Sequence, residues 1–392
     1  MTTTRVLSTT LLASLTLTGL ALPSASAATD PWVRPWGTNA VGQLGNATTI
    51  PQTTPGDVVG LARADVRTLS GGGDDKTAFA VALLADGTVK SWGANATGQL
   101  GNGTTTNQPV PGTVAVLSGI SAVDAGLDHG LAVRKGRVYA WGGNAKGQLG
   151  NGVTDEKNPA KVPVLVQALD EVKDVGAGCS FSAALRQDGT VWTWGDGTNG
   201  RLGLGGTDAR NTPQQIKDLT DIAAISVGCS HVLALTVDGK VKSWGEGKNG
   251  QLGNDTTADS PSPVDVKLLS GVTQISAGPF HDFAILKDGT VKGWGWNKFG
   301  QLGDGTTTDR TTPVPIDTLK GTKSIIGGAD FTVAAQPDGS VLTLGNNDAS
   351  QLGDGTTTAT TARDNKPVIA LPSGSGITRV ATLANGKSAY AY

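Results

Sequence analysis

The sequence has few of the side chains that usually carry catalysis or hold metal ions. Among 392 residues there are two cysteines, three histidines and one methionine. Three motifs of catalytic or phosphate-binding sites are also missing: the Gly-x-Ser-x-Gly elbow, the His-Glu-x-x-His pair and the Walker loop. Carboxylates are plentiful, but no paired acid–base set stands out among them. We therefore predict a protein that is not an enzyme and that needs no metal and no cofactor.

Strong charge and long apolar runs are scarce as well. Lysine and arginine total 31 against 33 aspartates and glutamates, a net charge of −2, and there is no basic run. With this balance the chain lacks the concentrated positive charge that is typical of proteins that bind nucleic acid. Past residue 27 no apolar run is long enough to cross a bilayer. We expect no nucleic acid as partner and no membrane span.

The first 27 residues differ from the rest of the chain. Arg5 is their only charge, Val6 to Leu22 is mostly apolar, and Ala25-Ser26-Ala27 offers small residues for cleavage. This pattern is typical of a secretory signal peptide rather than a transmembrane helix. The alternative is a disordered or tail-anchored N-terminus. We predict a signal peptide over residues 1–27, a mature domain over residues 28–392, and a secreted, extracellular protein from a bacterium.

One short stretch recurs seven times in the remaining chain. In one copy it begins with Trp92-Gly93-Ala94-Asn95 and ends with Gly98-Gln99-Leu100-Gly101; in the last copy Leu344 replaces the Trp. Successive copies are 49 to 56 residues apart, as measured between the central leucines Leu44, Leu100, Leu149, Leu202, Leu252, Leu302 and Leu352. A period of this length indicates one supersecondary unit per repeat, stacked or arranged in a ring.

Five repeats also contain two short apolar runs joined by Asp-Gly, as in Ile225 to Leu235 followed by Val241 to Gly245, and Lys135-Gly136 is a variant of this turn. Such runs predict a β-hairpin, because glycine adopts positive φ freely in the turn. Three residues after each Trp only Asn or Gly occurs, and since both tolerate a left-handed backbone we predict a left-handed turn there. These positions are Asn39, Asn95, Asn144, Gly197, Gly247, Asn297 and Asn347.

Together the elements Ala-Gly-x-x-His-x-x-Ala-Leu, Asp-Gly-x-Val and Trp-Gly-x-Asn-x-x-Gly-Gln-Leu-Gly resemble the RCC1 repeat, named for the regulator of chromosome condensation. The likeness extends over essentially the whole chain after residue 30. It implies an all-β fold, a seven-bladed β-propeller with four-stranded blades. Guanine-nucleotide exchange is not expected, because the namesake's basic tail and wedge hairpin have no counterpart here. The Gly-Trp-Arg-His-Thr motif of the plant UV-B receptor is absent too.

The two ends of the repeat region each carry part of a repeat. Trp32 to Gly37 matches the second arm of a hairpin whose first arm is missing, and residues 377–392 match inner strands. We predict that the two segments share one blade, which closes the ring and removes exposed sheet edges.

All three histidines fall on one position of the repeat. The seven copies have histidine, phenylalanine or serine at this position: His129, His231, His281, Phe79, Phe181, Phe331 and Ser388. A position that accepts His or Phe indicates packing rather than catalysis. Three such residues spread around a ring would also not gather on one metal.

Cys179 and Cys229 occupy one position in consecutive repeats, just after the expected innermost strand. Equivalent atoms about 7 Å from a sevenfold axis lie about 6 Å apart, within the range of a disulfide. Two possibilities remain open: a disulfide formed in an oxidising compartment, or two buried free thiols that pack as small apolar residues.

Departures from the repeat are the best hints of a binding site. Trp296 and Phe299 stand in a turn where the other copies have smaller residues, and Phe280 lies in the same repeat. Exposed aromatics of this kind resemble a binding anchor. The alternative is local packing of one loop against its neighbour.

The leading hypothesis is a secreted, non-catalytic protein-binding propeller, a monomer whose partner is an unknown extracellular protein. One rival is a cell-wall or carbohydrate-binding module with aromatics stacked on a glycan. The other is a propeller-type β-lactamase inhibitor, since a secreted bacterial member of this architecture is such an inhibitor, or a hydrolase or lyase acting at the channel mouth.

Overall fold

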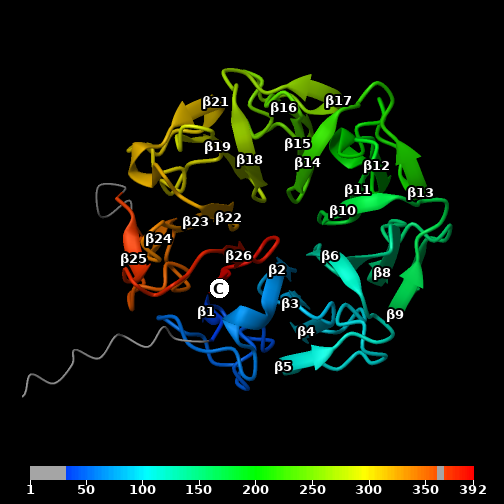
Figure 1. Ribbon diagram of the computed structural model, residues 1–392, viewed down its shortest axis with the longest axis horizontal. Helices are drawn as coiled ribbons and strands as arrows, with labels where there is room; N and C mark the ends of the chain where they lie inside the picture. The colour runs from blue at the N-terminus through cyan, green and yellow to red at the C-terminus, as the bar shows by residue number, and fades with distance from the viewer. Residues whose placement is uncertain (1–31, 360–365) are drawn as a thin grey trace, which may run out of the picture.

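The computed structural model describes residues 32–359 and 366–392, so the predicted signal peptide lies outside the described residues. In the described part, seven antiparallel sheets are set around one axis (Figure 1). Regular helix in this part is limited to the 3-10 turns η1 (Arg63–Asp65), η2 (Thr198–Gly200) and η3 (Asp317–Leu319), and none of it could cross a membrane. The protein is an all-β, seven-bladed β-propeller, which confirms the predicted fold.

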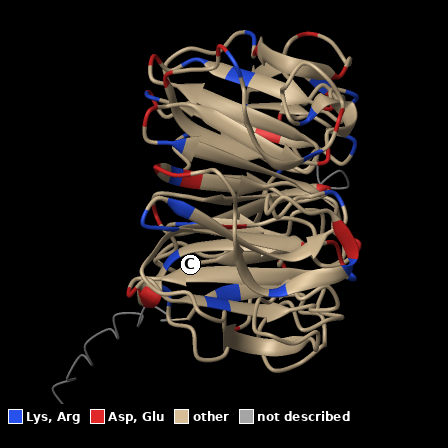
Figure 2. Cartoon of the chain, turned by 90° about the vertical axis from the view of Figure 1, so that its right-hand side faces the viewer, with Lys and Arg blue, Asp and Glu red and all other residues tan. Residues whose placement is uncertain are grey.

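Blades 1 to 6 each have four strands that run in chain order from the axis to the rim. Seen from the rim, the disc carries acidic and basic positions interspersed (Figure 2). In blade order the strands are β2 (Val66–Gly72), β3 (Phe79–Leu84), β4 (Val89–Gly93), β5 (Gln108–Thr113); β6 (Ile120–Ala125), β7 (His129–Arg134), β8 (Arg137–Asn144), β9 (Asp155–Leu165); β10 (Val172–Ala177), β11 (Phe181–Arg186), β12 (Val191–Gly195), β13 (Arg210–Gln215); β14 (Ile222–Val227), β15 (His231–Thr236), β16 (Val241–Gly245), β17 (Ser260–Asp265); β18 (Val272–Ala277), β19 (His281–Leu286), β20 (Val291–Gly295), β21 (Arg310–Pro315); β22 (Ser324–Gly327), β23 (Phe331–Ala335), β24 (Val341–Gly345), β25 (Val368–Leu371).

Blade 7 is built from both ends of the described chain. Its strands are β26 (Val380–Thr382), β27 (Ser388–Ala391) and β1 (Arg34–Gly37), in that order from the axis. β1 pairs with β27, and an isolated bridge from Gly37 to Gln52 stands in place of a fourth strand. Figure 1 shows β26 and the C-terminal residue beside β1 and β2. The prediction of a shared closing blade is confirmed.

The repeated tryptophans join neighbouring blades. Each is fully buried, and each indole N–H donates to a backbone carbonyl of the preceding blade, as from Trp92 to Gln43 at 2.8 Å. The same bond from Trp36 to Gln351, also 2.8 Å, joins the shared blade 7 to blade 6. A bulky apolar ring with one polar edge fills the space between two sheets and satisfies a carbonyl there.

The predicted left-handed turn at the Asn or Gly position is wrong. None of these residues has positive φ; the left-handed residues come three positions later, as at Gly300 with φ 71°. Asn is required for its side chain, because the Asn297 Oδ1 accepts from the Leu302 amide at 2.9 Å and its Nδ2 donates to the Thr306 carbonyl at 3.1 Å. Gly197 is required for space, since a Cβ there would lie 2.2 Å from a backbone oxygen of the loop that follows.

Candidate functional site

The aromatic cluster, defined as Phe280, Trp296 and Phe299, lies at one end of blade 5. Phe280 is in the loop between β18 and β19, and Trp296 directly follows β20. The register pairs the next residue, His281, with Gly295. The Trp296 amide donates to the Phe280 carbonyl at 2.9 Å. Strand pairing therefore brings together the three residues that the sequence singled out.

The three rings contact one another edge to face. The centroids of Phe280 and Trp296 are 5.8 Å apart at 81°, and those of Trp296 and Phe299 are 5.6 Å apart at 88°. The Lys298 ammonium lies 6.0 Å from the centre of the Phe299 ring. All three rings remain partly exposed. Each edge-to-face contact contributes about 1 kcal/mol, so the rings hold one another in place while presenting apolar area to solvent.

Buried amides fix the turn that carries the cluster. Asn297, between Trp296 and Lys298, is fully buried. Its Nδ2 also donates to the Asp304 carboxylate at 3.0 Å, and the same carboxylate pairs with Arg310 at 2.7 Å. The Gln301 Oε1 accepts from the Phe299 amide at 2.9 Å. The anchor rests on a rigid turn, which reduces the entropy lost on binding.

Gln301 has a further property that sequence analysis missed. In blades 2 and 6 the equivalent glutamines, Gln148 and Gln351, each donate Nε2 to an aspartate at 3.1 Å. Phe280 occupies the position of that aspartate in blade 5. The Gln301 side chain is fully buried, and its Nε2 has no hydrogen-bond partner among the described residues. Blade 5 has thus exchanged a satisfied polar contact for an aromatic ring, at a cost in stability.

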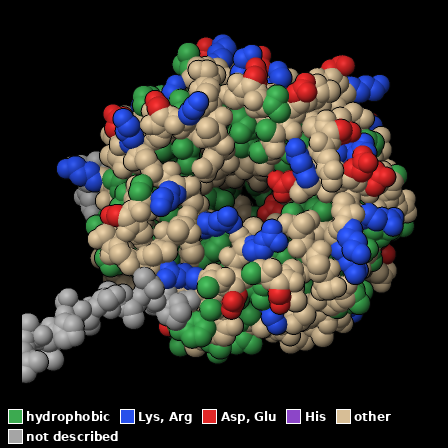
Figure 3. Space-filling model, in the orientation of Figure 1, with side chains coloured by type: hydrophobic (Ala, Val, Ile, Leu, Met, Phe, Trp, Pro, Cys, Tyr) green, Lys and Arg blue, Asp and Glu red, His purple; other side chains and the backbone are tan. Residues whose placement is uncertain are grey.

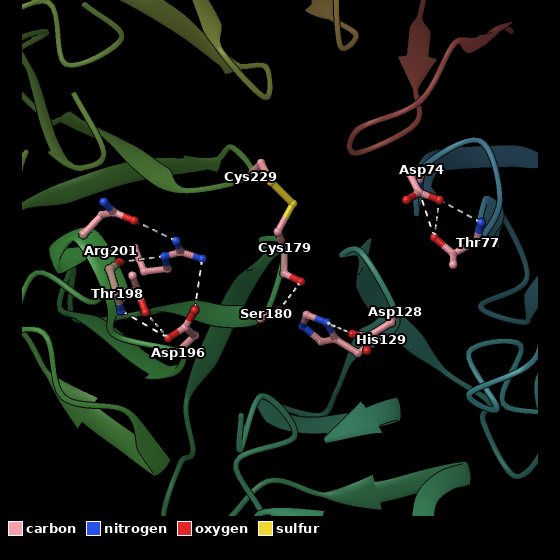
Figure 4. The surroundings of a disulfide bond; sticks show 11 residues. Asp74, Thr77, Asp128, His129, Cys179, Ser180, Asp196, Thr198, Arg201 and Cys229 are labelled. Carbon is pink, nitrogen blue, oxygen red and sulfur yellow. Dashed lines mark hydrogen bonds and ion pairs between the residues drawn. A yellow bond between two sulfur atoms is a disulfide. The ribbon is translucent and has the colours of Figure 1, made fainter. Parts of the chain in front are cut away.

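The structure joins Cys179 and Cys229 in a disulfide between blades 3 and 4, with 4.6 Å between the two Cα atoms (Figure 4). The Cys179 amide donates to the Cys229 carbonyl at 3.0 Å. Both cysteines directly follow the Gly after an inner strand, and Cys229 lines the central channel.

Arg201 departs from the repeat at a position that the sequence analysis did not single out. It stands where the other six copies have glutamine. Its guanidinium is buried and pairs with Asp196 at 3.3 Å (Figure 4). It also lies 6.0 Å from the centre of the Phe181 ring. Because the charge is paired and packed, we assign Arg201 a structural role.

Two carboxylates on inner strands, Asp124 on β6 and Asp174 on β10, were not identified by any sequence motif. Asp124 accepts from the Ser70 hydroxyl at 2.6 Å and from the Ala177 amide at 2.8 Å, which links blades 1, 2 and 3. Burial raises its pKa. Burial, helped by the charge of Asp124, raises the pKa of Asp174 to about 6. The channel cavity measures about 160 Å³ and is lined by all seven inner strands.

The histidines lie fully buried between blades, and each meets a polar side chain of the next blade. The Nε2 atoms of His129, His231 and His281 are 2.9, 2.9 and 2.8 Å from Ser182, Asp282 and Thr332. Where the repeat has Phe or Ser instead, the facing position in the next blade is Gly130, Val232, Ala389 or Ala80. The choice of His or Phe therefore follows the polarity of the neighbouring blade.

We predict that His281 makes the propeller sensitive to acid. Burial, helped by nearby His231, lowers the pKa of His281 from 6.5 to about 3. Unfolded His281 therefore binds a proton at a pH where folded His281 does not. The unfolding free energy is at its full value above the pKa of the unfolded state, and it falls as the pH drops from there toward the pKa of the folded state. The double variant His281→Phe/Thr332→Val copies the Phe181–Val232 pair of another interface. Between pH 7 and pH 5 it should lose about 2 kcal/mol less of its unfolding free energy than the parent, as measured by urea denaturation; an equal loss would contradict the assignment.

Comparison with known families agrees with this architecture. The family model of the RCC1-like domain matches residues 153–391, and models of the regulator of chromosome condensation (RCC1) repeat match residues 86–133 and 120–148. The chain belongs to the RCC1-like domain family.

Similar proteins share only part of their length with this RCC1-like chain. The human E3 ubiquitin-protein ligase HERC2 is 33% identical over 191 residues, which are 46% of this chain and 4% of HERC2. The ultraviolet-B receptor UVR8 of Arabidopsis thaliana is 31% identical over 141 residues, 35% of this chain and 32% of UVR8. The activities of these whole proteins are therefore not assigned to this chain.

Solved structures support the fold over nearly the full length of the RCC1-like propeller. Prp20p from Saccharomyces cerevisiae has a TM-score of 0.77 at 21% identity, covering 93% of this chain and 92% of its own. Human WBSCR16 has a TM-score of 0.79 at 22% identity, covering 92% and 98%. At such identities the likeness shows the fold alone.

Proposed function

We propose that this chain is a secreted, non-catalytic propeller that binds a protein partner through the aromatic cluster. The observation that supports the proposal is the three-ring cluster itself. It is partly exposed and held by a hydrogen-bonded turn, and among the described residues it occurs in blade 5 only. Binding hot spots are enriched in such aromatic anchors.

A protein fits the cluster better than a glycan does. Sugar rings stack on a flat aromatic surface, whereas the Trp296 ring stands nearly perpendicular to both phenylalanine rings, at 81° and 88°, so the cluster forms no continuous flat surface. An uneven apolar surface of this kind is complementary in shape to the side chains of a partner protein. Relatives of the same fold also bind proteins: Prp20p was studied for its binding to Gsp1p and histones, and yeast RCC1 (Prp20) was solved with Kap60 bound.

Export is supported by the signal-like segment over residues 1–27 and by the Cys179–Cys229 disulfide, since disulfides persist in oxidising compartments. The partner is therefore sought among extracellular proteins.

The proposal predicts saturable capture of one defined polypeptide by residues 28–392. The ligands offered are the producer's secreted proteins, a panel of β-lactamases and purified cell wall. Trp296→Ala/Phe299→Ala should weaken binding of the captured, purified polypeptide by about 1000-fold, since hot-spot truncations cost about 2 kcal/mol each.

The matched control is Glu246→Ala/Asn249→Ala, which changes the same two positions in blade 4. It should bind like the parent. All three proteins should unfold in one cooperative transition, and the cluster variant should unfold at a slightly lower temperature because it loses both ring contacts. Equal loss in both variants would refute the assigned surface. Retention of cell wall alone would replace the protein partner by a glycan.

A further inference from the structure

A second surface of different chemistry lies where blades 7 and 1 meet. A hollow of about 440 Å³ opens there, and arginine dominates its lining: Arg63, Val66, Arg67, Thr68, Thr378, Arg379 and Tyr392. We call it the arginine hollow. Its volume is within the range of small-molecule sites.

The arginines reach the hollow from distant parts of the chain, and two of them, Arg63 and Arg379, donate to backbone oxygens. The Arg63 Nη1 donates to the Ser375 carbonyl at 2.6 Å, and the Arg379 Nη1 donates to the Arg67 carbonyl. The Tyr392 carbonyl accepts from the Arg379 amide at 2.9 Å, which fixes the opposite wall. Because a guanidinium has five N–H donors, Arg379 keeps further donors for a ligand.

Two arginines of the hollow, Arg67 and Arg379, have positive charges that no acidic side chain of the described residues neutralises. In residues 32–359 and 366–392 no carboxylate forms an ion pair with Arg67 or Arg379, and the Arg67 side chain is exposed without a hydrogen bond. The chain as a whole is slightly acidic, with net charge −2, so this concentration of positive charge is local. Figure 3 shows basic side chains around the channel mouth over β2, β22 and β26, and acidic ones over β6 and β10.

The arginine hollow and the aromatic cluster lie on opposite faces of the disc. All inner strands run in the same direction along the axis. Arg67 and Arg379 stand at the beginnings of β2 and β26, whereas Phe280 follows the end of β18. A partner bound at the cluster would leave the hollow open, so the two sites are independent.

We propose that the arginine hollow binds an anionic group, a carboxylate or phosphate, of a small ligand. Guanidinium matches both groups with paired, charge-assisted hydrogen bonds. The Thr68 and Thr378 side chains and the Tyr392 ring, which share the lining, supply hydroxyls and an apolar wall for the remainder of the ligand.

Calorimetric titration of residues 28–392 tests this site with two probes, inorganic phosphate and citrate, at constant ionic strength. We expect one-to-one binding of at least one probe. Arg67→Gln should weaken it about tenfold or more, because one charge-assisted contact is lost. Tighter binding of phosphate would assign a phosphate ester as the ligand class, and tighter binding of citrate a carboxylate.

The matched control is Lys323→Gln. Lys323 holds the same position at the start of the inner strand of blade 6 but does not line the hollow. It should bind both probes like the parent, and both variants should keep the parental unfolding temperature. The proposal is overturned if neither probe binds at millimolar concentration, or if Lys323→Gln weakens binding as much as Arg67→Gln does.

Discussion

Removing residues 377–392 is expected to unfold the whole propeller rather than to trim one blade. The deletion takes away β26 and β27, and with them the only strand that pairs with β1 in the described structure. Tyr390 alone is fully buried, contacts Trp92 edge to face at 6.1 Å, and donates to the Gln43 carbonyl. Truncating one such aromatic costs about 3–5 kcal/mol, a large part of the 5–15 kcal/mol that typically stabilises a domain.

The loss also reaches both neighbouring blades. Val380, Ala389 and Ala391 pack in one core cluster with Phe331 of blade 6, whereas Tyr390 packs in another with Trp92 of blade 1. Without these residues two blade interfaces become open sheet faces, and the edge of β1 is unpaired.

Calorimetry and circular dichroism of residues 28–376 against residues 28–392 check this prediction. The truncated chain should show no cooperative transition. As a control, Ile369→Ala on β25, where the side chain is 61% exposed, should change the unfolding free energy by less than about 0.5 kcal/mol. A truncated chain that unfolds at the parental temperature would show that the ring does not depend on its closure.

The closure could be predicted from sequence because it depends on short-range pattern. Trp-Gly, Asp-Gly and the apolar runs need the same environment in every blade, so an incomplete copy at each end already indicates a shared blade. The Asn or Gly position could not be interpreted in this way. Asn297 is selected by side-chain hydrogen bonds and Gly197 by the close approach of a later loop, and these two causes produce the same pattern as a left-handed turn.

The two candidate sites also differ in whether the sequence could predict them. The aromatic cluster could be found because Trp296 and Phe299 break a pattern that the other copies keep. The arginine hollow could not, because Arg67 and Arg379 are 312 residues apart and stand at exposed positions whose identity varies freely. Only the closed ring brings them together.

The interface between blades 4 and 5 carries the second large expected effect. His231 and Asp282 are both fully buried, with the imidazole Nε2 2.9 Å from the carboxylate, and burial raises the pKa of Asp282. Asp282→Val should destabilise the protein by about 3–5 kcal/mol, because His231 is left in the core without its partner. His231→Phe should cost a similar amount, since it leaves the carboxyl group unsatisfied.

The double variant His231→Phe/Asp282→Val should recover most of this loss. It recreates the Phe181–Val232 contact that the preceding interface already uses within one apolar cluster. Replacing a buried polar pair by packed apolar groups is commonly neutral or stabilising, and the change in volume costs less than about 1.5 kcal/mol. Urea denaturation of the four proteins gives the coupling energy, which we expect to be at least about 2 kcal/mol. If the two single costs simply add in the double variant, the partner in the next blade does not determine whether this position is His or Phe, and position-specific packing within each blade must determine it instead.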